Sequence, residues 1–291
     1  MSARFHSTSH IHLLWLASLL LFIEPAHSEL ITLQMDNDLE ATAELQLGQP
    51  NSKPILLLHG FLQTRDFFTV RRLGEALHDM GYTVLLPNLT LGINHRRQSL
   101  ACEAIHTHSM EQDEREIARW VTWLHQYTDH PVTLIGHSIG SLSSLAYWVD
   151  NPAAPIDQVL LISLIPFAQG PIAKESEVDY RRAMDHMASP NDEMISFRLA
   201  FCDDYITTAG NYLSYLNWNR DKTLAALNKT PSKPIIVLGS KDQRLGNDWT
   251  PQLKQAGANI VEIEGANHFF DHEFEFDLMD TIAELLQNSK E

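Results

Sequence analysis

The chain is poor in positive charge. Its 291 residues carry 21 Lys and Arg against 37 Asp and Glu, which gives a formal net charge of −16. A protein this acidic repels the phosphates of nucleic acids and of anionic lipids. We therefore expect no nucleic-acid partner and no attraction to an anionic membrane surface.

Long apolar runs are missing after the first thirty residues, as are repeats, and the composition is that of one ordinary soluble domain. At the N-terminus, Arg4 precedes an apolar stretch (residues 11–23) and a small-residue pattern (residues 26–28). Because the stretch is too short for a comfortable permanent span, we predict a signal peptide over residues 1–28, cleaved near Ser28. This predicts an exported protein, periplasmic or secreted, without a stable membrane anchor; an uncleaved anchor is the alternative.

Cysteine is also scarce, with only Cys102 and Cys202. Export would place both in an oxidising compartment, where an even count permits one disulfide. Two free buried thiols are the alternative. The chain offers no set of Cys, Asp or Glu at a familiar zinc spacing beside His106 and His108, so we expect no metal site and surface positions for both histidines.

What the chain does have is an alternation of short apolar runs with helical periodicities. Strands are predicted at residues 30–35, 41–47, 55–58, 84–86, 132–135, 159–162, 235–238 and 260–263. Helices are predicted around residues 70–77, 117–124, 142–149 and 274–285, and another is predicted to begin near residue 247 or 248. The alternation favours a doubly wound, mostly parallel sheet with helices on both faces. Between residues 167 and 230 it stops and aromatic residues accumulate, which we interpret as a helical insertion packed over the sheet.

A serine stands where a strand turns sharply into a helix. The predicted strand at 132–135 runs directly into Gly136-His137-Ser138-Ile139-Gly140, and a helical stripe follows. This is the context of a nucleophile elbow, in which small flanking residues let the backbone bend and leave the serine Oγ exposed at the carboxyl edge of the sheet. Ser138 is therefore the predicted nucleophile.

Serine needs a base, and the base needs an acid that orients it. Asp242 follows the predicted strand at 235–238, and His268 follows the strand at 260–263. Loops that follow parallel strands meet at the same edge of the sheet, so three distant positions can converge there. The order Ser, Asp, His along the chain is that of this type of triad. Alternatively, Asp242 is a turn-forming aspartate and His268 a surface histidine.

The reaction also needs backbone N–H groups to stabilise an oxyanion. One is expected from Ile139, immediately after the nucleophile. The other is expected from Phe61, in the His59-Gly60-Phe61 turn that follows the strand at 55–58.

Taken together, the turn at 59–61, the elbow, Asp242 and His268 resemble the α/β-hydrolase superfamily over nearly all of residues 29–291. The resemblance implies an eight-stranded mixed sheet, the triad Ser138, Asp242 and His268, and a lid inserted after the sixth strand, here about residues 167–230. Many members carry an Asp-x-x-Gly-x-Gly-x-Ser stretch after the fourth strand. This chain has instead a longer loop over residues 88–109, with Arg96 and Arg97 expected to face solvent.

We therefore expect an esterase of the carboxylesterase type that forms an acyl-enzyme on a small-molecule ester or thioester and needs no cofactor. An amidase or peptidase using the same triad is an alternative. A lyase or a non-catalytic binding protein on the same fold is another.

Overall fold

The computed structural model describes residues 28–188 and 193–288. The predicted signal peptide lies outside these ranges except for Ser28, at which the first strand begins. Within the described ranges, no helix is both long and apolar enough to cross a membrane.

A sheet of eight strands forms the centre of the molecule, in the order β1-β2-β4-β3-β5-β6-β9-β10. The strands are β1 (Ser28–Gln34), β2 (Glu40–Gln46), β3 (Pro54–Leu58), β4 (Thr83–Asn88), β5 (Val132–His137), β6 (Ile156–Ile162), β9 (Ile235–Gly239) and β10 (Asn259–Ile263). β2 pairs antiparallel with β1 and β4, and the other neighbours pair in parallel. The predicted eight-stranded, mostly parallel sheet is confirmed.

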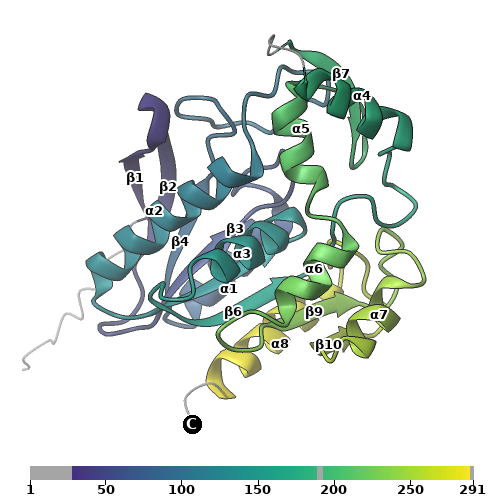
Figure 1. Ribbon diagram of the computed structural model, residues 1–291. Helices are drawn as coiled ribbons and strands as arrows, with labels where there is room; N and C mark the ends of the chain where they lie inside the picture. Colours follow the sequence, from purple (N-terminus) through teal and green to yellow (C-terminus); the bar gives the residue numbers. More distant parts are fainter. Residues whose placement is uncertain (1–27, 189–192, 289–291) are drawn as a thin grey trace, which may run out of the picture.

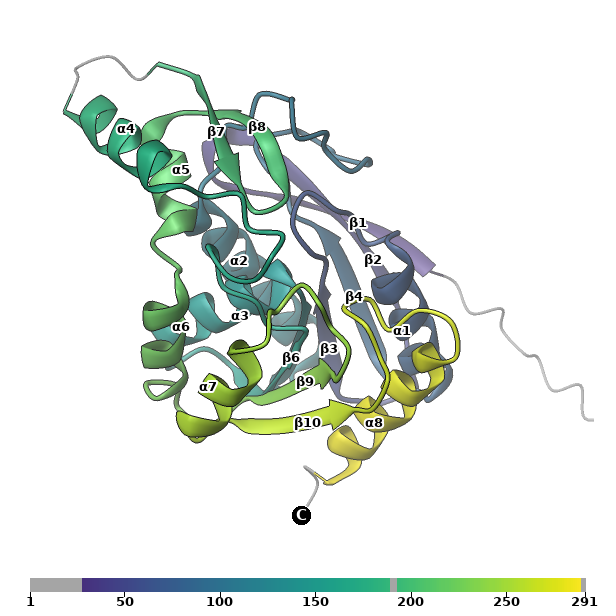
Figure 2. The same cartoon turned by 90° about the vertical axis from the view of Figure 1, so that its right-hand side faces the viewer.

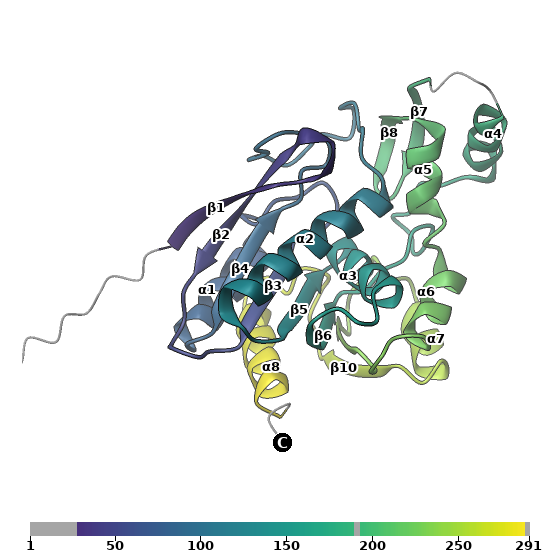
Figure 3. The ribbon, with the colours of Figure 1, turned by 60° about the vertical axis from the view of Figure 1, so that its left-hand side comes forward.

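Helices cover both faces of this sheet (Figure 1, Figure 3). α1 (Phe68–Asp79) and α8 (Phe274–Asn288) pack against one face, and α2 (Met110–Thr128), α3 (Ile139–Asp150) and α7 (Trp249–Gln255) against the other. β3 shows why its run is apolar throughout: Ile55 and Leu57 belong to the core of the first face, while Leu56 and Leu58 belong to the core of the second. An interior strand covered on both sides needs apolar residues at every position.

The segment between β6 and β9, residues 163–234, is called the lid insertion below. It contains α4 (Glu177–Met187), α5 (Ala209–Leu216), α6 (Arg220–Leu227) and an antiparallel hairpin of β7 (Ile195–Leu199) and β8 (Cys202–Thr207). Figure 2 shows α4, α5 and the hairpin at the end of the molecule opposite α8. The insertion predicted to be helical thus contains three helices in its described residues, and it also contains a hairpin that the sequence analysis did not predict. In β7 the buried Phe197 and Leu199 flank the exposed Arg198. This strand has only five residues and lies in a segment rich in aromatic residues, so its alternation did not indicate a strand.

Candidate active site

The backbone at Ser138 is strained. Ser138 has φ of 59° and ψ of −122° at the junction of β5 and α3. A positive φ is unfavourable for a residue with a side chain and costs on the order of 1–3 kcal/mol. Backbone hydrogen bonds hold the turn, since the Ser138 N–H donates to the Ile162 carbonyl (2.8 Å) and the Ser141 N–H donates to the Ser138 carbonyl (2.9 Å).

The two glycines of the elbow are required by close backbone approach. A Cβ on Gly136 would lie 2.3 Å from the Gly140 carbonyl oxygen, and one on Gly140 would lie 2.4 Å from the His59 carbonyl oxygen. No side chain fits at these separations. The glycines thus let α3 start directly under the turn and against the end of β3, as the sequence pattern predicts.

Ser138, His268 and Asp242 lie within hydrogen-bond distance of one another. Ser138 Oγ is 2.9 Å from His268 Nε2, and His268 Nδ1 is 2.6 Å from Asp242 Oδ2. Asp242 Oδ1 accepts the N–H of Arg244 (2.9 Å), which fixes the carboxylate. Both His268 and Asp242 are buried. The arrangement suits transfer of the serine proton to His268, with Asp242 stabilising the imidazolium that results.

His137, inside the elbow, helps to hold His268 in place. Burial, with His268 as the next cause, lowers the pKa of His137 to about 3, so the ring is neutral. Its Nε2–H donates to the His268 carbonyl (3.0 Å), which also accepts the Ser163 hydroxyl (2.8 Å). Sequence reasoning missed this role, because the residue before the serine is unrestricted in the motif.

The loop that carries Phe61 lies against Ser138. A Cβ on Gly60 would sit 3.4 Å from Ser138 Cβ, so the backbone at Gly60-Phe61 borders the serine. The N–H of Ile139, the first residue of α3, has no intrahelical acceptor because of its position. Phe61, Ser138 and Ile139 line one cavity. The two residues predicted to supply the N–H groups, Phe61 and Ile139, thus lie beside Ser138.

Hydrogen bonds of His59 and Arg96 hold this loop in place. Burial first, and then Arg96, lower the pKa of His59 to about 3. The neutral ring donates from Nδ1 to the Gly60 carbonyl (2.9 Å) and accepts the Arg96 guanidinium at Nε2 (3.0 Å). Arg96 is 3% exposed, so its predicted solvent position was wrong, whereas Arg97 is exposed. A buried arginine is retained here because the His59 ring and two carbonyl oxygens accept its hydrogen bonds.

The surface positions predicted for His106 and His108 were also wrong, since their exposed fractions are 0% and 2%. His108 contacts the hydroxyls of Tyr205 and Tyr215, and Tyr215 donates to Asp113 Oδ2 (2.6 Å). His106 stacks on Tyr205 with ring centroids 4.0 Å apart. These contacts join the 88–109 loop and α2 to the lid insertion. Within the described ranges, no group of three or more His, Cys, Asp or Glu residues is arranged to hold a metal ion.

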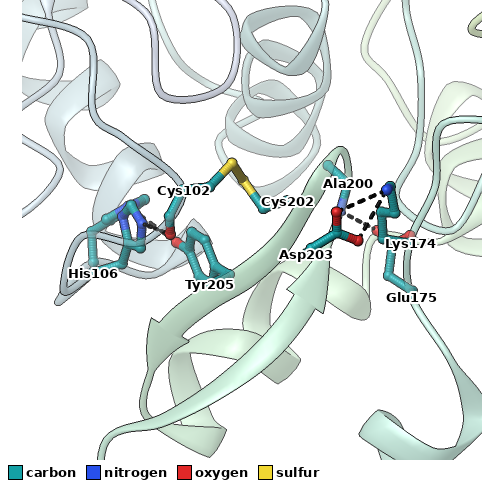
Figure 4. Close-up of a disulfide and its surroundings, with 9 residues drawn as sticks. Cys102, His106, Lys174, Glu175, Ala200, Cys202, Asp203 and Tyr205 are labelled. Carbon is teal, nitrogen blue, oxygen red and sulfur yellow. Dashed lines mark hydrogen bonds and ion pairs between the residues drawn. A yellow bond between two sulfur atoms is a disulfide. The ribbon is translucent and has the colours of Figure 1, made fainter.

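A disulfide reinforces this junction. Cys102 is bonded to Cys202, at the start of β8, across a sequence separation of 100 residues (Figure 4). The bond therefore fastens the hairpin of the lid insertion to the 88–109 loop.

The cavity at Ser138 is small, about 40 Å³. That is room for about three water-sized groups. It lies between the triad and the lid insertion, and its walls are mainly apolar. The residues that line it are Phe61, Gln63, Ser138, Ile139, Ile165, Pro166, Phe167, Ala168, Gln169, Ile172, Ala173, Glu175, Ala200, Phe201, Arg244, His268 and Phe269. Sequence reasoning could not place Glu175, Gln63 or Arg244 in this wall, because no motif carries them.

A doubly wound sheet with a strained serine at a strand-to-helix turn, and with Asp and His after later strands, defines the class of α/β-hydrolase folds. A family model described as the alpha/beta hydrolase family matches residues 55–279, more than half of the chain. The chain belongs to this family.

Solved structures agree on the fold. The chain is similar to Est1E from Butyrivibrio proteoclasticus, with 14% identity and a TM-score of 0.63 over 89% of this chain and 98% of that one. It is also similar to a thioesterase domain from the curacin biosynthetic pathway, with 19% identity and a TM-score of 0.61 over 88% and 99%. The Pyrococcus furiosus esterase PF2001 matches with 15% identity and a TM-score of 0.60 over 92% of each chain. No curated protein matches the sequence.

Proposed function

We propose that the protein is a serine hydrolase that cleaves a carboxylic ester, or a thioester, through an acyl-enzyme. The observation that carries the proposal is the continuous chain from Ser138 Oγ to His268 Nε2 (2.9 Å) and from His268 Nδ1 to Asp242 Oδ2 (2.6 Å). Such a chain activates a serine that is otherwise a weak nucleophile.

In the proposed mechanism, Ser138 Oγ attacks the substrate carbonyl while His268 accepts the serine proton. The N–H groups of Phe61 and Ile139 stabilise the oxyanion, and Asp242 stabilises the imidazolium. His268 then protonates the leaving group, which departs. Water, deprotonated by His268, attacks the acyl-enzyme and releases the acid.

The small apolar cavity favours a short acyl group. Esters and thioesters agree with the family and with the esterase and the thioesterase domain among the similar structures. An amidase or peptidase would use the same triad on a poorer leaving group. A lyase or a binding protein on this fold would not turn over esters.

The test is hydrolysis of p-nitrophenyl esters of graded chain length by wild type and Ser138→Ala. We expect the variant to lose about four to six orders of magnitude in turnover. Ser196→Ala, in β7 outside the cavity, is the matched control and should retain wild-type rates. Equal rates in wild type and Ser138→Ala would contradict the mechanism. Labelling of Ser138 by a fluorophosphonate without turnover of any ester would favour the lyase or binding alternative.

A further inference from the structure

The lid insertion places a single carboxylate in the wall of the cavity. Among the described residues that line the cavity, Glu175 is the only acidic one. It lies just before α4. Most of the other lining residues are apolar, including Ile172, Ala173 and Phe201, although Gln63, Gln169 and Arg244 also line the cavity. A carboxylate in such surroundings needs a hydrogen-bond partner or an opposite charge, because burying its charge without one is costly.

Backbone groups hold this carboxylate but leave its charge uncompensated. The N–H of Ala200 donates to Glu175 Oε1 (2.9 Å), and the N–H groups of Ala168, Lys174 and Glu175 itself also favour its ionised form. Oε2 is buried and makes no hydrogen bond to the described part of the chain. N–H dipoles fix a carboxylate in place without supplying a formal positive charge.

Two cationic side chains, Lys174 beside Glu175 in sequence and Arg244 in the wall of the same cavity, contact other groups. Lys174 Nζ pairs with Asp203 Oδ1 (2.9 Å), as Figure 4 shows, and the Arg244 guanidinium lies over the Phe269 ring, 4.6 Å from its centroid. Desolvation raises the pKa of Glu175, and no charged side chain contributes to the shift. The backbone N–H groups lower this pKa again, but desolvation is the larger effect, so the protein offsets only part of the cost of burying this charge.

The hairpin of the lid insertion also fixes the position of Glu175. Its partner Ala200 has φ of 52° and stands two residues before Cys202, which is bonded to Cys102. Figure 4 shows the disulfide and the contact between Ala200 and Glu175 at the same end of the hairpin. The carboxylate is thus hydrogen-bonded to a hairpin that the disulfide fastens, which helps to hold it in place as a recognition group requires.

We infer that Glu175 recognises a cationic amine on the substrate, whose N–H groups would bind the carboxylate from the cavity and compensate its charge. This inference rests on the proposed function, and it narrows the substrate class to short esters that carry an ammonium group. The formal net charge of −16 also favours cationic substrates, because it attracts cationic molecules toward the protein.

The experiment compares esters with isosteres in which carbon replaces nitrogen. Alanine and β-alanine methyl esters place the ammonium group on the acyl side. Each is compared with the uncharged methyl ester in which a methyl group replaces the ammonium group. Dimethylaminoethyl butyrate places it on the alcohol side and is compared with isopentyl butyrate. We expect Glu175→Gln to lower kcat/KM for a cationic ester by about tenfold or more and for its isostere by less than about twofold.

Glu177→Gln is the matched control. It removes the same charge two residues away, where the Glu177 side chain is 72% exposed and pairs with Arg181 outside the cavity. We expect this variant to change neither rate. An equal loss on cationic and uncharged esters in Glu175→Gln would overturn the inference in favour of a purely structural role. Unchanged preference in both substrate series would also overturn it.

A binding measurement separates this inference from the proposed function. Calorimetry with the Ser138→Ala protein measures how tightly the unhydrolysed cationic esters and their isosteres bind, whether or not Ser138 is the nucleophile. We expect the preference for the cationic ester to disappear in Ser138→Ala/Glu175→Gln. Equal binding of cationic and uncharged esters by Ser138→Ala would overturn the inference, while loss of turnover in Ser138→Ala would still support the mechanism.

Discussion

Backbone contact at the elbow leaves no room for a side chain at residue 140. A Cβ there would lie 2.4 Å from the His59 carbonyl oxygen and 3.0 Å from that of Leu58, two backbone groups that directly precede Gly60 and Phe61 in the loop beside Ser138. We expect Gly140→Ala to destabilise the fold by about 1–3 kcal/mol. Displacement of the loop should also lower ester turnover by about 10²-fold.

Gly210 provides the control for this substitution. In α5 a Cβ at residue 210 would meet only Met187 Sδ at 3.7 Å, an ordinary contact. Gly210→Ala should therefore be neutral, or stabilising by up to about 1 kcal/mol through helix propensity. Urea unfolding and ester turnover of both variants provide the check. A Gly140→Ala protein as stable and active as Gly210→Ala would show that the close approach is not a constraint.

At the residue scale, the sequence predicts the positions that a motif or a strand end defines. Ser138 follows β5, and Asp242 and His268 follow β9 and β10, so their proximity depends only on topology. His59 and Glu175 escaped prediction because their roles depend on contacts with residues far away in sequence, such as Arg96 and Ala200. No local pattern encodes such contacts.

Among the elements, the least predictable is the lid insertion. Interior strands such as β3 and β9 have apolar runs that a periodicity argument detects. The β7–β8 hairpin is short and only partly buried, so its pattern is weak. The 88–109 loop was predicted to be polar surface, yet His106 and His108 are buried because Tyr205 and Tyr215 of the lid insertion cover them. Tertiary packing decided these positions.

The disulfide should account for much of the stability of the junction between the lid insertion and the 88–109 loop. It closes a loop with a sequence separation of 100 residues. For a loop of this size, the entropic model gives at most about 4 to 5 kcal/mol. We expect Cys102→Ala/Cys202→Ala to lower the unfolding free energy by up to this amount and to raise KM, because Ala200 and Phe201 of the cavity wall adjoin Cys202.

Denaturant unfolding with and without reductant checks this expectation. Reductant should bring the midpoint of wild type to that of the double variant and should leave the double variant unchanged. A wild-type midpoint insensitive to reductant, under conditions in which mass spectrometry shows two free thiols, would contradict it.

For the molecule as a whole, buried neutral histidines such as His59 and His137 link stability to pH. Burial is the largest cause that lowers the pKa values of His59 and His137 from 6.5 to about 3. Between these values the unfolded chain binds protons that the folded chain does not, so unfolding becomes more favourable as pH falls below about 6.5. Each histidine should contribute up to about 1.4 kcal/mol per pH unit over this range.

His137→Gln isolates one of these contributions. Glutamine keeps an N–H group that can donate to the His268 carbonyl, but it does not titrate.

The carboxyls of Glu114 and Glu116 have the opposite effect on the pH dependence of stability. Burial raises their pKa values to about 8 and about 7, so the folded chain binds protons that the unfolded chain does not. Their effect cancels when the variant is compared with wild type at each pH. Urea unfolding from pH 7 down to pH 4 should show a slope smaller by about 1.4 kcal/mol per pH unit in the variant. Parallel curves would mean that His137 is protonated in the folded protein.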